Sequence, residues 1–237
     1  MKISVVIPAL NEQGFIEKAV ASLVGQSLPR RDFEIIVVDN GSTDETSALA
    51  KRAGADCVVF EPMKGLSAAR ARGLAQATAP IIAFLDADCL APPNWLERIL
   101  RTFAAKPHII ALGGAYDLSA DSQIQRLFSV FWQRLVIPCF TAAMTVVWKP
   151  AAVLFGGNYA ARRDILARIG FDANFVFYGE DTATALALAK CGTVCWDPSL
   201  TVKSSNRRYR DEGAFRLFVR YVLTWFSVYF RGKPPKF

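Results

Sequence analysis

Short apolar runs alternate with amphipathic stretches through the first part of the chain. The apolar runs, rich in Val and Ile, predict strands at Ile3–Ile7, Phe33–Val38, Asp56–Phe60 and Pro80–Leu85. The stretches between them predict helices over Glu12–Leu23, Ser42–Arg52 and Ser67–Gln76. This alternation is typical of an α/β fold, with a mostly parallel sheet covered by helices on both faces.

Local signals indicate where two of these elements begin or end. Pro8 directly follows the first apolar run and is expected to stop that strand. Ser42 and Glu45 have the spacing of a capping box, which predicts the start of the second helix.

Polar clusters follow three of the predicted strands. They are Pro8–Glu12, Asp39–Asp44 and the pair Asp86 and Asp88. Each cluster alone is compatible with ordinary turn, cap or solvated loop residues. Because the carboxyl ends of parallel strands meet at one edge, where such sheets bind ligands, we expect the three clusters to form one site.

Two apolar regions lie outside this pattern. Leu127–Phe155 is interrupted by Pro138, Lys149 and Pro150, which argues against a membrane span and favours a hydrophobic lip beside the site. Phe215–Phe230 is apolar almost all round. Its uninterrupted apolar stretch, between Arg220 and Arg231, is too short to cross a bilayer. It suits an interfacial helix on an anionic membrane, or a helix docked on protein.

Composition and charge restrict the class of protein. Hydrophobic residues make up 52% of the 237 residues, which argues against disorder. The net charge of +7 comes wholly from residues 203–237, which predicts a basic tail with its own partner rather than a nucleic-acid-binding body. Five cysteines without a disulfide pattern, and a start in Met1 and Lys2 without a signal peptide, lead us to expect a cytoplasmic protein.

Five motifs in this order resemble the inverting glycosyltransferases of family 2, which have the GT-A fold. The motifs are VVIPALNE at 5–12, IVVDNGSTDET at 36–46, GLSAARARGL at 65–74, FLDADC at 84–89 and GED at 179–181. The resemblance covers roughly residues 3–200. It implies a nucleotide-sugar donor, most often a UDP-sugar, a divalent Mg²⁺ or Mn²⁺ ion, and transfer with inversion at the anomeric carbon.

The resemblance also implies roles for individual residues. Asp88 is expected to bind the metal, and carboxylate oxygens are the ligands that hard cations prefer. Donor-binding positions carried over from the family are Pro8, Ala9, Glu12, Asp39, Arg70 and Asp86. For Arg70, a solvated helix arginine is the alternative, as we expect for Arg72.

The later motifs are expected to serve the acceptor. Asp181 is expected to be the base that takes the proton of the acceptor hydroxyl, with Glu180 in support. Acids at a helix N-terminus are also favoured by the helix dipole alone. Gly157 and Asn158 resemble the segment that lines the acceptor region, although a turn before the next helix explains the glycine equally well.

These features predict a transferase domain over residues 1–202, with a nucleotide-binding half at 1–90 and an acceptor half at 91–202. Residues 203–237 form the basic aromatic tail. The QxxRW motif of processive synthases is missing, which favours transfer of one sugar, and the apolar regions favour a lipid or lipid-linked acceptor at the inner membrane face. The alternatives are a nucleotidyltransferase acting on a sugar phosphate and a non-catalytic membrane adaptor.

Overall fold

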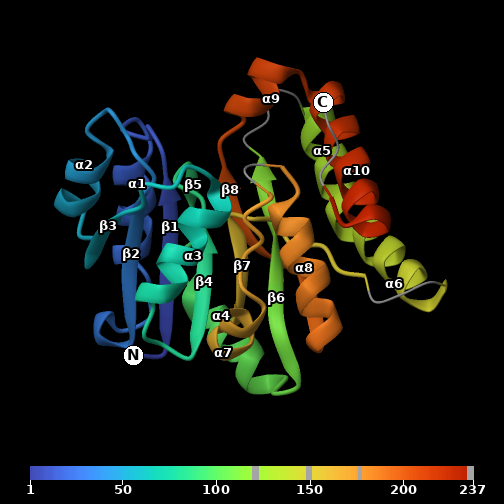
Figure 1. Ribbon diagram of the computed structural model, residues 1–237, viewed down its shortest axis with the longest axis horizontal. Coiled ribbons are helices and arrows are strands. Elements are labelled where there is room, and N and C mark those ends of the chain that lie inside the picture. The colour runs from blue at the N-terminus through green and yellow to red at the C-terminus, as the bar shows by residue number, and fades with distance from the viewer. Residues whose placement is uncertain (119–122, 148–150, 176–177, 234–237) are drawn as a thin grey trace.

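The computed structural model describes residues 1–118, 123–147, 151–175 and 178–233 as one sheet flanked by helices (Figure 1). The strands are β1 (Ile3–Ala9), β2 (Phe33–Asp39), β3 (Cys57–Phe60), β4 (Ile81–Leu85), β5 (Cys89–Leu90), β6 (Ile109–Leu118), β7 (Asn158–Arg162) and β8 (Thr193–Ser204). The α-helices are α1 (Ile16–Val24), α2 (Thr46–Arg52), α3 (Leu66–Gln76), α4 (Trp95–Ala105), α5 (Gln123–Phe131), α6 (Ile137–Val147), α7 (Arg163–Ile169), α8 (Glu180–Cys191), α9 (Arg207–Glu212) and α10 (Ala214–Arg231). A 3₁₀ turn, η1 (Arg30–Asp32), precedes β2, and a π-helical segment, η2 (Trp132–Val136), joins α5 to α6.

The sheet has the order β3-β2-β1-β4-β7-β6-β8-β5. The four N-terminal strands β1 to β4 are mutually parallel, as the sequence predicts. β7 runs antiparallel to both of its neighbours, and β5 pairs antiparallel with the end of β8. The mostly parallel α/β architecture is confirmed. Every antiparallel pairing involves β7 or β5, which lie beyond β4 in the sheet order.

Two apolar layers enclose the sheet. One contains Trp95, Ile99 and the residues of β1, β2 and β4 that face α1 and α4. The other contains Phe84, Tyr159 and the residues that face α3, α7 and α8. Both faces of β1 are therefore fully buried, which explains its continuous apolar sequence.

Two local expectations at the strand ends are wrong. Pro8 does not stop β1, which continues to Ala9. The pairing of β1 with β4 ends at Val6, so Pro8, which has no backbone N–H, removes no hydrogen bond from that pairing. The capping box also does not form. α2 begins at Thr46 without a side-chain cap from Ser42, and the backbone N–H of Thr46 donates to Asp44 instead.

The segment from Gln123 to Val147 is one continuous helical stretch, so Pro138 does not interrupt it. The five residues before Ile137 form the π-helical turn, and the Gln133 carbonyl accepts from the Trp196 indole N–H at 3.0 Å. A partner outside the helix thus compensates for the N–H that Pro138 lacks. Lys149 and Pro150 lie outside the described residues.

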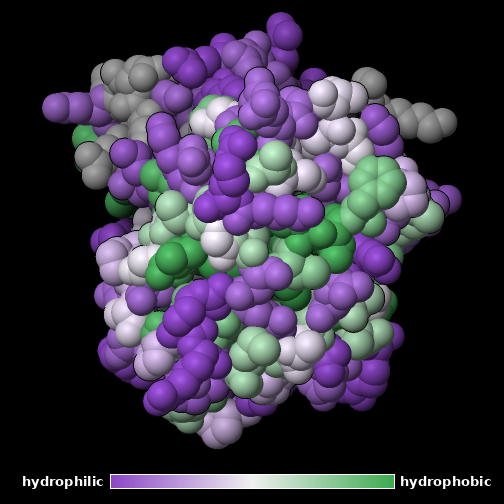
Figure 2. All heavy atoms as spheres, turned by 90° about the vertical axis from the view of Figure 1, so that its left-hand side faces the viewer, coloured by the Kyte–Doolittle hydropathy of each residue, from purple (hydrophilic) through white to green (hydrophobic). Residues whose placement is uncertain are grey.

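Among the described residues, one helix is long and apolar enough to cross a membrane by length and composition, Leu127–Val146, and 17% of its apolar 18-residue window is buried. α10 packs along this helix on the right of Figure 1, with Phe140 against Trp225 and Trp132 against Phe218. The opposite end of the molecule is different. Figure 2 shows that hydrophilic residues dominate there, around a smaller hydrophobic area.

Candidate active site

The polar clusters after β1 and β2 lie side by side at one edge of the sheet. The Asn40 N–H donates to the Ala9 carbonyl at 2.9 Å, and the Thr43 N–H donates to the Asn11 side chain at 2.8 Å. Asn11 has φ of 55°, in the left-handed region that asparagine tolerates. No motif in the sequence singles out Asn11 by itself, although it belongs to the polar cluster Pro8–Glu12 after the first strand.

Asp39 ends β2 at this edge, where 8% of it is exposed. One carboxylate oxygen accepts from the Ser42 N–H at 2.8 Å, and the other accepts from the Ser47 hydroxyl. Burial alone would raise the pKa of Asp39, but these hydrogen bonds outweigh it and hold the pKa below its ordinary value. Asp39 is therefore a fixed, ionised acceptor.

The acids after β4 form a cluster that suits a hard cation. Ligand atoms of Asp86, Asp88 and Cys89 all lie within 4.8 Å of one another. Burial, together with the negative charges of Asp86 and Glu12, raises the pKa of Asp88 to about 6. The raised pKa indicates that negative charge is concentrated at this site. Burial also raises the pKa of the Cys89 thiol, which leaves the carboxylates as the ligands.

Glu12 joins this cluster from the β1 edge. Its backbone N–H donates to the Thr46 hydroxyl at 2.8 Å, and one of its carboxylate oxygens is buried without a hydrogen-bond partner among the described residues. A buried carboxylate oxygen of this kind beside Asp88 is suited to bind a cation or to accept from a ligand hydroxyl. Asp86 and Asp88, with Glu12 near enough to act on the pKa of Asp88, thus form a carboxylate set that fits Mg²⁺ or Mn²⁺.

Arg207 faces the same acids from the far end of the chain. Its Nη2 lies 2.7 Å from Glu12 Oε1 and 3.7 Å from Asp88 Oδ2. β5 pairs with β8 at Cys89 and Ser204, and this pairing brings the residues after β8 back to the acids. The sequence analysis placed Arg207 in the basic tail, but the structure gives it partners inside the site.

Arg70 is neither a solvated arginine nor an exposed donor ligand. Its side chain is fully buried, lies 3.2 Å from Asp86 and forms an ion pair with Glu180. Arg70 therefore fixes the carboxylates of β4 and α8 relative to each other, and the expectation of direct donor contact is corrected because the guanidinium has no exposed surface. Arg72 is exposed, as expected.

Gly156 and Gly157 are required by neighbouring side chains. A Cβ on Gly157 would lie 2.4 Å from Asp86 Cγ, and a Cβ on Gly156 would lie 2.5 Å from Arg70 Nη2. The Gly157 N–H also donates to the Tyr116 hydroxyl at 2.8 Å, and that hydroxyl is 3.4 Å from Asp86 Oδ2. Tyr116, which the sequence analysis missed, thus helps to orient Asp86.

Asn158 lies in the core, so its assignment to the acceptor region is corrected. It is fully buried and accepts from the Trp95 indole N–H at 2.9 Å. Its amide donates to the carbonyls of Ala115 and Leu200 at 2.7 and 2.8 Å. These hydrogen bonds join Asn158 to Trp95, Ala115 and Leu200, so its side chain ties β6, β7, β8 and α4 together. It has no exposed surface for an acceptor.

The two acids that begin α8 differ in environment. Glu180 is buried against Arg70, whereas Asp181 is partly exposed. Asp181 accepts from the Thr182 N–H at 2.7 Å. Burial nevertheless raises its pKa, against the opposing effect of Arg70. A partly exposed carboxylate with a raised pKa is a better proton acceptor than an ordinary surface acid.

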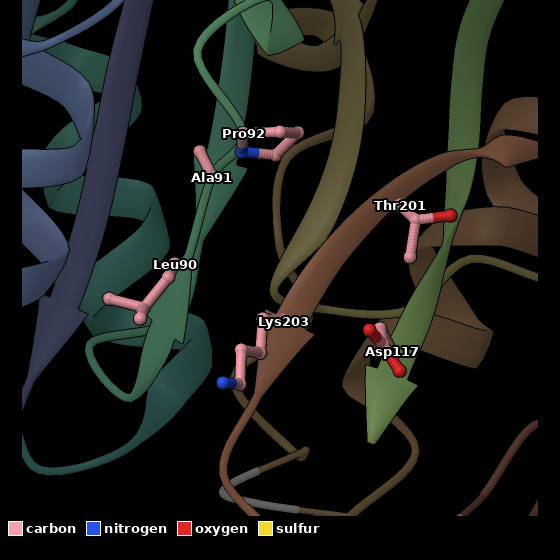
Figure 3. A pocket seen from close by; sticks show the side chains of 6 residues that line it. All are labelled: Leu90, Ala91, Pro92, Asp117, Thr201 and Lys203. Atoms are coloured by element: carbon pink, nitrogen blue, oxygen red, sulfur yellow. The ribbon is translucent and has the colours of Figure 1, made fainter. Parts of the chain in front are cut away.

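A separate pocket of about 340 Å³ lies beside β6 and β8 and is shown in Figure 3. Leu90, Ala91, Pro92, Asp117, Thr201 and Lys203 line it. None of these is a candidate site residue, although Leu90 directly follows Cys89 of the acidic cluster.

The family model described as "Glycosyl transferase family 2" matches residues 4–170, most of the chain. The chain belongs to glycosyl transferase family 2. The matched range contains the strand ends of β1, β2 and β4 and the acidic cluster, whereas α8, α9 and α10 lie beyond it.

Two relatives illustrate the similarity to proteins of known name. The chain is 36% identical over 107 residues to the glycosyltransferase AglE of Haloferax volcanii, covering 43% of this chain and 35% of the relative. It is 30% identical over 192 residues to a glucosyl-3-phosphoglycerate synthase of Mycolicibacterium smegmatis, covering 71% and 59%. The chain thus spans less than two thirds of the length of either relative.

Solved structures agree with the fold. A mannosyltransferase from Pyrobaculum calidifontis, in complex with GDP-Man and Mn²⁺, is 24% identical with a TM-score of 0.77, covering 99% of this chain and 66% of that one. A glucosyl-3-phosphoglycerate synthase from Mycobacterium tuberculosis, in complex with Mn²⁺, UDP-glucose and phosphoglyceric acid, is 25% identical with a TM-score of 0.66, covering 99% and 81%.

Proposed function

We propose that this family 2 chain is a metal-dependent glycosyltransferase, which moves one sugar from a nucleoside-diphosphate sugar to an acceptor hydroxyl with inversion. The observation that carries the proposal is the convergence of Glu12, Asp86 and Asp88 at the edge of the sheet, with Asp181 at the start of α8. The metal-containing complexes of the two solved relatives support it.

The donor half of the site consists of the strand ends. Asp39, held ionised by Ser42 and Ser47, is suited to accept hydrogen bonds from the nucleoside, and Pro8, Ala9 and Glu12 border the same edge. Asp86, oriented by Arg70 and Tyr116, faces the sugar and ribose. When bound to Asp88, Mg²⁺ or Mn²⁺ would neutralise the charge that develops on the leaving diphosphate.

The proton of the acceptor hydroxyl passes to Asp181 in this proposal. Its raised pKa favours proton uptake, and the ion pair between Glu180 and Arg70 fixes the start of α8. A single displacement from the side opposite the leaving diphosphate inverts the anomeric carbon.

An apolar surface favours a lipid or lipid-linked acceptor. The exposed apolar residues of the α5–α6 stretch are Leu127, Phe128, Val130, Phe131, Leu135 and Val146. The outer face of α10 adds Phe215, Leu223, Phe226 and Phe230, while its inner face is docked on the protein through Leu217, Trp225 and Tyr229. Exposed Arg134, Arg216, Arg231 and Lys233 lie on the same helices or directly follow α10 and suit an anionic inner membrane face.

Titration calorimetry of UDP and GDP, each with and without Mn²⁺, tests the donor site. We expect metal-dependent binding of one nucleotide, lost in Asp88→Ala. The sugar is then found by screening donors of that nucleotide, and NMR of the product gives its anomeric configuration. Consumption of a nucleoside triphosphate with a sugar phosphate would instead establish a nucleotidyltransferase, and absence of any nucleotide binding would favour an adaptor.

Co-sedimentation with liposomes tests the membrane surface. We expect binding to vesicles containing phosphatidylglycerol at low salt, reduced in a Leu127→Glu, Val146→Glu double variant. Met63→Glu is the control, since Met63 is 62% exposed but lies on another part of the surface, in the loop between β3 and α3. Equal binding by the wild type and the double variant would overturn the assignment of this surface.

A further inference from the structure

Arg207 is a cation already present among the acids of the cluster. Its guanidinium pairs with Glu12 at 2.7 Å, approaches Asp88 at 3.7 Å and lies over the Phe15 ring at 4.7 Å. The hydrogen bond that Arg207 donates to Glu12 raises the pKa of Arg207 further, so the side chain is permanently charged. In the ligand-free protein, Arg207 thus supplies part of the positive charge that the acids require.

The backbone holds Arg207 in place while its side chain stays accessible. The Ser205 N–H donates to the Asp88 carbonyl at 3.2 Å, and the Arg207 N–H donates to the Ser205 hydroxyl at 3.1 Å. The Arg207 side chain is 38% exposed, whereas that of Arg70 is fully buried. The contact with Asp88 is also too long for a hydrogen bond. Arg70 is therefore fixed, and Arg207 is free to exchange partners.

We propose that Arg207 is the resident counter-ion of the acidic cluster, which leaves Asp88 when a divalent ion binds and then pairs with the diphosphate of the donor. Repulsion between the two cations favours the exchange. The planar guanidinium then finds a matching bidentate partner in the phosphate oxygens that the ion holds nearby. This inference rests on the proposed nucleotide-sugar function.

The proposed exchange predicts that one substitution, Arg207→Gln, changes the Mn²⁺ affinity and the nucleotide affinity in opposite directions. Without nucleotide, Arg207 competes with the metal, so Arg207→Gln should bind Mn²⁺ about tenfold more tightly, because one partly screened like charge is removed. With saturating Mn²⁺, Arg207 assists the nucleotide, so Arg207→Gln should bind UDP or GDP about tenfold more weakly. A residue that only supports the fold would weaken both.

The test is calorimetry of Mn²⁺ alone, and of UDP and GDP in Mn²⁺, on the full chain. Arg210→Gln is the matched control, because Arg210 is an exposed arginine of the same helix, and it should change neither affinity. Arg207→Lys keeps the charge without the planar fork, so Mn²⁺ affinity should stay at the wild-type value and nucleotide affinity should fall. If Arg207→Gln does not fold, the nucleotide affinity of Arg207→Lys tests the proposed exchange instead.

The outcomes separate the two proposals. If Mn²⁺ supports nucleotide binding in the wild type but Arg207→Gln shifts both affinities in the same direction or neither, the exchange is wrong and the transferase function stands. If Arg207→Lys matches the wild type for nucleotide, the exchange is also wrong. If the wild type itself binds no nucleotide with Mn²⁺, both proposals fail.

Discussion

Arg70 and Glu180 form a buried ion pair that joins α3 to the first turn of α8. Their side chains are 0% and 4% exposed, and Arg70 also contacts Asp86. The pair connects the donor half of the site to the acid proposed as base, since Asp181 follows Glu180 directly. Removing Glu180 would leave the buried Arg70 without a buried counter-charge, because Asp86 is partly exposed, and this loss is costly.

Glu180→Gln should therefore destabilise the protein by about 3 kcal/mol, because Arg70 loses its buried counter-charge. Urea denaturation measures the change in the free energy of unfolding. Glu45→Gln is the control: Glu45 pairs with Arg52 at 3.6 Å on the surface, where the loss should stay below about 1 kcal/mol. Equal losses in the two variants would show that the buried pair has no special role in stability.

Asp181→Asn should lower turnover by at least about 100-fold, because the amide cannot take the acceptor proton. The affinity for the nucleotide with Mn²⁺ should not change, since the base acts on the acceptor. Steady-state kinetics and calorimetry on the same preparation check both statements. Turnover near that of the wild type would exclude Asp181 as the base.

Mn²⁺ should stabilise the protein more at about pH 7.5 than at about pH 5. The pKa of Asp88 is about 6 in the folded chain and 3.8 ordinarily, so its charge reduces stability as pH rises through this interval. A bound cation removes that penalty, whereas at lower pH it must first displace a proton. Thermal melts with and without Mn²⁺ measure the difference, which Asp88→Ala should abolish. An equal Mn²⁺ shift at both pH values would contradict it.

Gly157→Ala should displace Asp86, because its Cβ would lie 2.4 Å from Asp86 Cγ. We expect a loss of about 1–3 kcal/mol in stability and weaker metal-dependent nucleotide binding. Gly14→Ala is the matched control, since its Cβ would meet nothing within 4 Å. If Gly157→Ala retains the nucleotide affinity of the control, Asp86 has no part in the donor site.

The sequence was sufficient for the parallel half of the fold and for the strand ends, because both follow from local patterns. Apolar runs predict β1 to β4, and parallel strands place Asp39, Asp86 and the first loop on one edge. Burial of individual polar side chains could not be predicted this way. Arg70 and Asn158 both lie inside the protein because partners distant in the sequence enclose them.

The remaining differences come from contacts between distant parts of the chain. The pairing of β5 with β8 connects residues that no periodicity relates, so Arg207 was assigned to the tail. The π-helical turn before Pro138 has no local signature either, and the helix continues because Trp196 supplies the external partner.

The pairing of β5 with β8 also affects how the protein is made. The ion pair between Glu12 and Arg207 closes a loop of 195 residues. A ribosome-bound chain that ends before β8 holds every acid of the cluster but not Arg207, which faces Glu12 and Asp88. The site is thus complete only after β8 and the residues that follow it have been made, and chains interrupted before Ser204 present an acidic cluster that retains Arg70 beside Asp86 but lacks Arg207.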